Sequence, residues 1–212
     1  LALLVNSKRS QDFFDKNVKN FAENQGQLCD LSQYLVNMQE LLDLAGLPST
    51  SKVLEVGPGQ GAFLKELSGR YDNLVALDNS GEMLGLAKEM LSDKSKNIEF
   101  VKSSLESYQL AKGQAPYNAM VFNMVLHHMP SPAGIFHKVK ELVADEGFLL
   151  IADLAAHNQD WTKESCGDFW LGFDSVELDE WAADASFEEK QSLYLGLKNG
   201  FQIQLKLFQK IK

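Results

Sequence analysis

The chain has 212 residues, of which 45% are hydrophobic and 23% are charged, a composition typical of a globular protein that can bury a sizeable core. A formal net charge of −9, without a dense cluster of Lys and Arg, argues against a polynucleotide as substrate. Cys29 and Cys166 form no CxxC pattern, and no segment reads as a signal peptide or a membrane span, so we expect a cytoplasmic protein with reduced thiols and no membrane contact.

Residues 1–46 carry apolar side chains at helical spacing on both sides of a polar break, and this pattern predicts two helices. Gly46 suits the position just after a helix end, and Pro48 prevents the helix from continuing. We therefore expect residues 1–48 to form an N-terminal helical extension.

From residue 52 onward, short apolar strands alternate with helical segments, which indicates a parallel sheet covered on both faces. The expected strands are residues 52–57, 73–78, 97–104, 117–125 and 147–154. The last segment, residues 190–211, instead alternates apolar and polar side chains around an Asn199-Gly200 pair. That pair is a strong hairpin signal, so the sheet is predicted to finish with an antiparallel hairpin.

Three glycines at alternate positions, Gly57, Gly59 and Gly61, separate the first strand from the helix that follows it. Glycine lets the backbone approach a ligand closely, and a loop in front of a helix N-terminus presents N–H groups to that ligand. The second strand ends in Asp78, where a carboxylate can accept hydrogen bonds from both hydroxyls of a ribose. A tight turn and a helix cap are the plain alternatives, but strand, loop and acid together favour a nucleotide-like ligand.

The glycine spacing distinguishes between kinds of nucleotide. A dinucleotide site needs the pattern GxGxxG. A P-loop needs GxxxxGK[ST], with a Lys-Ser or Lys-Thr pair directly after the glycines, and neither pattern is present. A dinucleotide oxidoreductase is therefore disfavoured. The stretch LEVGPGQG at residues 54–61 instead resembles the first motif of the class I S-adenosylmethionine-dependent methyltransferases.

Further segments resemble the same family over roughly residues 50–212. Asp78 in ALDNSGEML matches the family's ribose-binding acid, YNAMVFNMVLHHMPSP matches its fourth-strand segment, and the terminal hairpin matches its departure from a Rossmann sheet. The resemblance implies an α/β fold, a Rossmann-like three-layer αβα sandwich. Its seven-stranded, mostly parallel sheet would end in an antiparallel C-terminal hairpin, with helices added at the N-terminus. Residues 49–212 would be the S-adenosylmethionine-binding domain, which methylates a small-molecule acceptor and releases S-adenosylhomocysteine.

A narrower resemblance concerns the segments SQDFFDKN, MVLHHMPSP and HNQDWTKESCGDFWLGF. These look like methyltransferase domains fused to ArsR-type regulators, whose DNA-binding part precedes a helix like residues 1–22. The resemblance implies a DNA-binding part outside this sequence, in keeping with a first residue that is not Met, and no nucleic-acid contact by this chain. A non-catalytic sensor of the cofactor level is therefore the alternative to an enzyme, and a homodimer is compatible with either.

Carried over by position, the resemblance implies a set of cofactor-binding residues. The set is Glu55, Gly57, Gly59 and Gly61 for the methionine portion, Asp78 for the ribose, Asn79, Met83 and Ser104 for the adenine, and Asn123 for the amino-acid end. Ser104 departs from the family, which often has an acidic residue there, although a hydroxyl can still accept a hydrogen bond. The first helices of related enzymes close over the cofactor, and the aromatic residues of FFDKNVKNF suit either such a lid or plain packing.

Methyl transfer from a sulfonium needs alignment, desolvation and, for an O–H or N–H acceptor, a base. His127 and His128 follow the fourth strand, where a base is useful, and His128 is our candidate. The alternative interpretation is a pair that caps the loop or packs on the cofactor.

A second unusual stretch, residues 157–173, follows the fifth strand. It interleaves polar and aromatic side chains, and its candidates for an acceptor-binding lid are His157, Asp160, Trp161 and Trp170. An amphipathic helix at the sheet edge explains them equally well. A metal site from His157, Asp160 and Cys166 has no diagnostic spacing, so the sequence predicts no metal site.

Overall fold

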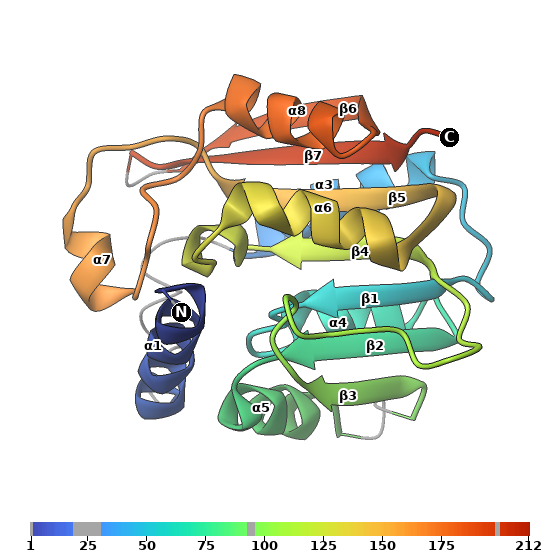
Figure 1. The fold of residues 1–212 in the computed structure, drawn as a ribbon, viewed down its shortest axis with the longest axis horizontal. Helices are drawn as coiled ribbons and strands as arrows, with labels where there is room; N and C mark the ends of the chain where they lie inside the picture. The colour runs from blue at the N-terminus through green and yellow to red at the C-terminus, as the bar shows by residue number, and fades with distance from the viewer. Residues whose placement is uncertain (1, 19–30, 93–95, 198–199) are drawn as a thin grey trace.

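The computed structural model describes residues 2–18, 31–92, 96–197 and 200–212. One seven-stranded sheet runs through the molecule in the order β3-β2-β1-β4-β5-β7-β6 (Figure 1). Its strands are β1 Lys52–Val56, β2 Asn73–Asp78, β3 Ile98–Lys102, β4 Tyr117–Asn123, β5 Val143–Leu154, β6 Phe187–Gly196 and β7 Gln202–Lys210. Strands β1 to β5 are parallel, whereas β7 is antiparallel to both β5 and β6. The predicted sheet and its terminal hairpin are confirmed, and Asn199 of the hairpin signal lies outside the described residues.

Helices cover both faces of the sheet. They are α1 Ala2–Asn17, α3 Leu31–Leu44, α4 Ala62–Ser68, α5 Gly81–Leu91, the 3₁₀ turn η2 Leu126–His128, α6 Pro132–Leu142, α7 Trp161–Ser165 and α8 Ser175–Asp184. Side chains of α3, α4 and α5 pack in one core, and side chains of α6 and α8 pack in a second core on the opposite face. The predicted three-layer sandwich is therefore confirmed. None of the helices in the described ranges is long and apolar enough to cross a membrane.

The strands that cross the middle of the sheet are buried on both faces. Val53 and Leu54 of β1 point to opposite faces, and both are completely inaccessible to solvent. A strand in this position reads as a continuous apolar run rather than as an alternating pattern, which explains why the sequence shows β1 and β4 so clearly. The edge strand β6 differs, because Glu188, Glu189 and Lys190 in its first half are exposed. The predicted hairpin consequently began only at Lys190, and the start of β6 at residues 187–189 was missed.

The helix α1 lies beyond the carboxyl ends of the central parallel strands (Figure 1). It also contacts α5, where the Ser80 hydroxyl is hydrogen-bonded to the carboxylate of Asp15. In open α/β sheets, ligands bind at the carboxyl ends of the strands. The position of α1 therefore places it over the end of the sheet where a ligand is expected.

Candidate functional site

A cavity opens at the carboxyl ends of β1, β2 and β4 and encloses about 680 Å³ of space, part of it open to solvent. Seven of the predicted site residues line it: Gly57, Gly59, Asp78, Asn79, Met83, Ser104 and His128. Phe14, from the aromatic run that the sequence offers as a lid, also lines it. The sequence did not single out the other lining residues, which are Ser7, Ser10, Val56, Leu77, Ser103, Leu105, Glu106, Met124, Val125, Met129 and Pro130.

The glycine loop forms the floor of this cavity at the end of β1. Gly57 has a φ of +61° and donates its N–H to the carbonyl oxygen of Leu77 at 2.8 Å. A Cβ atom at Gly57 would lie 2.3 Å from Cγ2 of Val125, so neither the backbone conformation nor the space admits a side chain. Gly61 does not line the cavity, because it is the N-cap of α4 and packs toward Leu91 of α5. The loop thus contains one glycine that packs closely against Val125 and another that starts the helix α4.

Asp78 stands at the end of β2 and lines the cavity beside the glycine loop. It accepts a hydrogen bond from the N–H of Ser80 at 2.8 Å, but the N-cap of α5 is Ser80, whose hydroxyl accepts from the N–H of Met83 at 3.1 Å. Asp78 is therefore not the cap of that helix. Burial raises the pKa of Asp78 to about 7, and the negative charge of Asp15 acts in the same direction. The hydrogen bond from the N–H of Ser80 opposes both effects.

Two polar groups behind the cavity lack partners. Glu55 of β1 is completely buried, neither of its carboxylate oxygens is hydrogen-bonded within the described part of the chain, and burial raises its pKa well above the usual range. The Oδ1 atom of Asn123, at the end of β4, is likewise buried without a partner. Unsatisfied buried polar groups are rare and costly. Both residues flank the strand ends where the sequence predicts the amino-acid portion of a cofactor.

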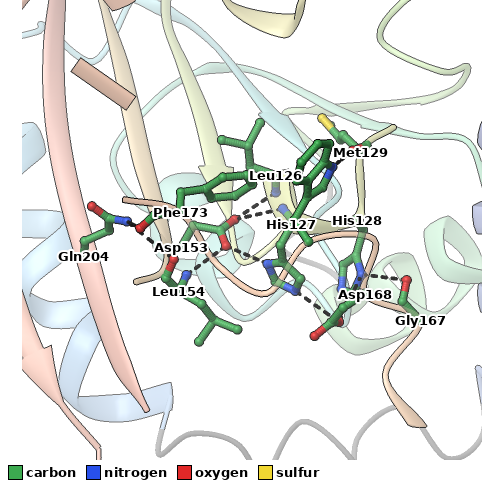
Figure 2. A network of polar contacts seen from close by, with 11 residues as sticks. Leu126, His127, His128, Met129, Asp153, Leu154, Gly167, Asp168, Phe173 and Gln204 are labelled. Atoms are coloured by element: carbon green, nitrogen blue, oxygen red, sulfur yellow. Dashed lines mark hydrogen bonds and ion pairs between the residues drawn. The ribbon is translucent and has the colours of Figure 1, made fainter. Parts of the chain in front are cut away.

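His127 is anchored from behind by Asp153, at the end of β5 (Figure 2). Its Nδ1 lies 2.6 Å from Oδ1 of Asp153, and Oδ2 of Asp153 accepts the N–H of Leu126 at 2.9 Å. Burial favours a neutral ring, but the carboxylates of Asp153 and Asp168 outweigh it and raise the pKa of His127. Asp153 was not predicted from the sequence, although an acid at the carboxyl end of a central strand was a usable signal.

His128 lines the cavity and packs edge-to-face against Phe14 of α1, with 4.9 Å between the ring centroids. Burial and the positive charge of His127 hold the pKa of His128 well below its usual range. Near neutral pH its ring is therefore uncharged, and one of its nitrogens carries a free lone pair.

Asp168 completes this cluster from the segment that follows α7. Its Oδ1 lies 3.6 Å from Nε2 of His127 and 3.5 Å from Nδ1 of His128, and only 1% of its side chain is exposed. Neither oxygen of Asp168 has a hydrogen-bond partner among the residues that the structure describes. Burial raises the pKa of Asp168, although the positive charge of His127 opposes the effect.

The four predicted acceptor-binding residues do not line the cavity. His157 packs edge-to-face on Phe201, Asp160 forms an exposed ion pair with Lys163 at 3.1 Å, and the ring of Trp161 is 46% exposed. Trp170 lies nearest, because its indole N–H donates to the carbonyl of Met129 at 2.9 Å, and Met129 lines the cavity.

The set His157, Asp160 and Cys166 does not come together as a group of possible metal ligands within the described ranges. Burial raises the pKa of the Cys166 thiol to about 11, so this side chain is a protonated thiol at neutral pH.

Comparison with known proteins shows what kind of protein carries this cavity. Residues 24–194, more than half of the chain, match the sequence model of a family described as "Methyltransferase domain". The chain belongs to this methyltransferase family. S-adenosylmethionine is its cofactor, and the close-approach glycine, the acid at the end of β2 and the unpartnered groups at the strand ends fit that ligand.

Individual relatives are similar to this methyltransferase over different extents. The ubiquinone biosynthesis O-methyltransferase of Salmonella paratyphi A is 26% identical over 116 residues, which are 55% of this chain and 48% of that enzyme. The chain thus matches about half the length of this curated relative. The N-methyltransferase NodS of Bradyrhizobium japonicum WM9, solved with S-adenosylhomocysteine, has the same fold, with a TM-score of 0.74, 16% identity and coverage of 96% of this chain and 100% of NodS.

The fold is also shared by the [4+2]-cyclase SpnF, with a TM-score of 0.77, 10% identity and coverage of 95% of this methyltransferase and 94% of the cyclase. Likeness at such low identity shows the fold alone. The acceptor must therefore be argued from the site.

Proposed function

We propose that this methyltransferase transfers the methyl group of S-adenosylmethionine to a small-molecule acceptor and releases S-adenosylhomocysteine. The observation that carries the proposal is one cavity, partly open to solvent, that is lined by the glycine loop, by Asp78 and by His128. A concave site at the carboxyl ends of parallel strands suits a nucleotide-like cofactor with a small acceptor beside it. The names of the O-methyltransferase of ubiquinone biosynthesis and of the N-methyltransferase NodS support methylation at oxygen or nitrogen.

The cofactor-side residues have separate proposed roles. The backbone at Gly57 and Gly59, together with Glu55, would hold the methionine portion, and Asp78 would accept hydrogen bonds from the ribose hydroxyls. The other predicted residues that would hold the remainder are Asn79, Met83, Ser104 and Asn123. Gly61 would act through the shape of the loop, since it starts α4 outside the cavity. The cavity wall also includes Glu106, whose carboxylate is a second candidate for the adenine amino group. When bound, S-adenosylmethionine supplies a methyl group on a positively charged sulfur.

The transfer step needs an acceptor lone pair in line with the carbon–sulfur bond. The new bond forms between the acceptor atom and the methyl carbon, the carbon–sulfur bond breaks with its electron pair going to sulfur, and an O–H or N–H acceptor releases its proton. The chain therefore has to align the acceptor, exclude water and promote loss of that proton.

His127 and His128 are the proposed catalytic residues on the acceptor side. A histidine pair can promote proton loss in two ways: it takes the proton, as the sequence predicts for His128, or it holds a cation that lowers the pKa of the acceptor. The position of Asp168, between the two rings, favours the second way.

Of the predicted extension of residues 1–48, the helix α1 is proposed to act as a lid, whereas α3 packs in the core. Ser7, Ser10 and Phe14 of α1 line the cavity, and Phe14 contacts the ring of His128. Trp170 is the predicted acceptor-binding residue that the geometry supports best, through its hydrogen bond to Met129. His157, Asp160 and Trp161 stay predictions from the sequence.

Turnover distinguishes the enzyme from the sensor of cofactor level. The purified chain is incubated with S-adenosylmethionine and separate panels of phenols, catechols, amines and carboxylic acids, and S-adenosylhomocysteine is quantified. Release above the rate without acceptor supports the proposal. Tight binding of S-adenosylhomocysteine in a calorimeter, without release for any panel, supports the sensor, and absence of binding refutes both.

A further inference from the structure

We propose that His127, His128 and Asp168 bind a divalent transition-metal ion, with Zn²⁺ as the first choice, on the acceptor side of the cavity. One nitrogen of each ring and one carboxylate oxygen all lie within 4.8 Å of one another. The three side chains come from η2 and from the segment after α7, so the site is formed only by folding (Figure 2).

The measured separations suit a single ion. The Asp168 oxygen lies 3.6 Å from Nε2 of His127 and 3.5 Å from Nδ1 of His128. Ligands at about 2.0–2.2 Å from a tetrahedral zinc ion are roughly 3.3–3.5 Å from one another. The oxygen therefore already lies at about the zinc-ligand spacing from each nitrogen, and the ring nitrogens, which are within 4.8 Å of each other, have to reach the same spacing to bind one ion.

Asp153 supplies the outer contact that metal-binding histidines usually have. A ligating histidine generally donates its other ring N–H to a carboxylate, which fixes its tautomer and orientation. The Nδ1 atom of His127 lies 2.6 Å from Oδ1 of Asp153, and that carboxylate is itself held by the N–H groups of Leu126 and Leu154. With the proton on Nδ1, the lone pair of Nε2 faces Asp168.

The carboxylate of Asp168 lacks a hydrogen bond within the described ranges, and this is a second observation that points to a ligand. Both oxygens are buried, and neither has a hydrogen-bond partner in the described part of the chain. A cation between Asp168 and the two rings would satisfy this carboxylate. For His128 to bind through Nδ1, its proton must lie on Nε2. The only loss is that Nδ1 no longer donates over the long distance of 3.4 Å to the carbonyl oxygen of Gly167.

Two imidazoles and one carboxylate leave a coordination position open, as in catalytic zinc sites. Since His128 lines the cavity, that position can receive the acceptor. An oxygen bound to the ion loses its proton near neutral pH, in the way that zinc lowers the pKa of bound water to about 7. This role of the ion in removing the acceptor proton rests on the proposed function, but the binding of the ion does not.

The test measures the ion directly. The full chain is purified without a polyhistidine tag, treated with a chelator and freed of it, and then titrated with Co²⁺ while its visible absorption is recorded. Zn²⁺ is added afterwards as a competitor. We expect saturable binding of about one ion per chain, and loss of the outer contact in Asp153→Asn should weaken it by about 10- to 100-fold.

Asp168→Asn is the decisive variant, and Asp160→Asn, at the exposed start of α7, is its matched control. We expect Asp168→Asn to bind Co²⁺ at least about tenfold more weakly than the wild type and Asp160→Asn to bind it equally well. Binding of S-adenosylhomocysteine shows that each variant is folded; if Asp168→Asn fails this check, His128→Gln replaces it with the same expected loss.

Two results would overturn the proposal: no saturable Co²⁺ binding by the wild type, or equal affinities of Asp168→Asn and Asp160→Asn. The cofactor measurement and the metal titration are independent. An absence of methyl transfer with intact Co²⁺ binding would therefore refute the proposed function and leave the metal site standing.

Discussion

Asp78→Asn tests the ribose contact with the least change in shape. The amide keeps the volume of the side chain and removes its negative charge. Hydrogen bonds to a charged acceptor contribute about 1.5–3 kcal/mol, and an amide oxygen retains part of this. We expect the affinity for S-adenosylhomocysteine at alkaline pH to fall by about 1–3 kcal/mol, which is roughly 5- to 150-fold.

The pKa of Asp78 adds a dependence on pH. Burial raises that pKa to about 7, and the ionised carboxylate is the better acceptor for the ribose hydroxyls. Wild-type affinity should therefore decline below about pH 7, approaching tenfold per pH unit, and converge toward that of Asp78→Asn. Any titration of the ligand itself affects both proteins equally, so the difference between them isolates this carboxylate.

Cofactor binding favours high pH, but the stability of the free protein should favour low pH. The pKa of Asp78 in the folded state lies above its ordinary value of 3.8, so ionisation opposes folding, and stability is lost as the pH rises from about 4 through about 7. The difference between the two pKa values sets an upper limit of about 4 kcal/mol on this loss of stability. Because solvent reaches this cavity wall, we expect a loss of about 1–2 kcal/mol, which Asp78→Asn should lack.

The assay is calorimetric titration with S-adenosylhomocysteine and urea unfolding of the free protein, both from about pH 5 to about pH 9. Asp72→Asn, exposed just before the opposite end of β2, is the control and should behave as the wild type. The assignment fails if Asp78→Asn binds as tightly as the wild type at alkaline pH, or if the two proteins share one pH profile.

Three further predictions concern the cavity wall. Gly57→Ala should lower the free energy of unfolding by more than about 2 kcal/mol and abolish cofactor binding, because the new Cβ meets the side chain of Val125. Adding Val125→Ala to this variant should restore part of the stability. The control is Gly85→Ala, which has open space at its Cβ and should lose no stability. Glu55→Leu should raise the free energy of unfolding of the free protein at pH 8 by about 1–3 kcal/mol, because it removes a buried carboxyl group that has no hydrogen bond within the described residues. The same variant should bind the cofactor more weakly. A less stable variant would mean that Glu55 has a partner. Phe14→Ala should weaken S-adenosylhomocysteine binding about fivefold in calorimetry, since α1 then covers the cavity less well, and an unchanged affinity would contradict the lid.

The parts of the fold that the sequence predicts are those with a strong local pattern. Central strands such as β1 and β4 are buried on both faces and therefore appear as apolar runs. The missed elements have no such pattern. Helix α8, with the sequence SVELDEWAAD, is largely acidic and covers the sheet with few residues, and the first half of β6 is charged because it lies at the sheet edge.

The cofactor half of the site was largely determined by the sequence. Gly57, Gly59 and Asp78 lie within two consecutive strand–loop–helix units, and parallel neighbouring strands necessarily bring their carboxyl ends together. Local chemistry and one rule of sheet topology therefore suffice to predict that they line one cavity.

Only the tertiary structure decided the other half. His127, Asp153 and Asp168 come from the exit of β4, the end of β5 and the segment after α7, and the long-range packing of that segment sets their distances. Hydrophobic periodicity specifies which face of an element is buried, but not which distant polar side chain meets it there. A buried carboxylate between two imidazoles is therefore a property of the folded chain, and no spacing along the sequence predicts it.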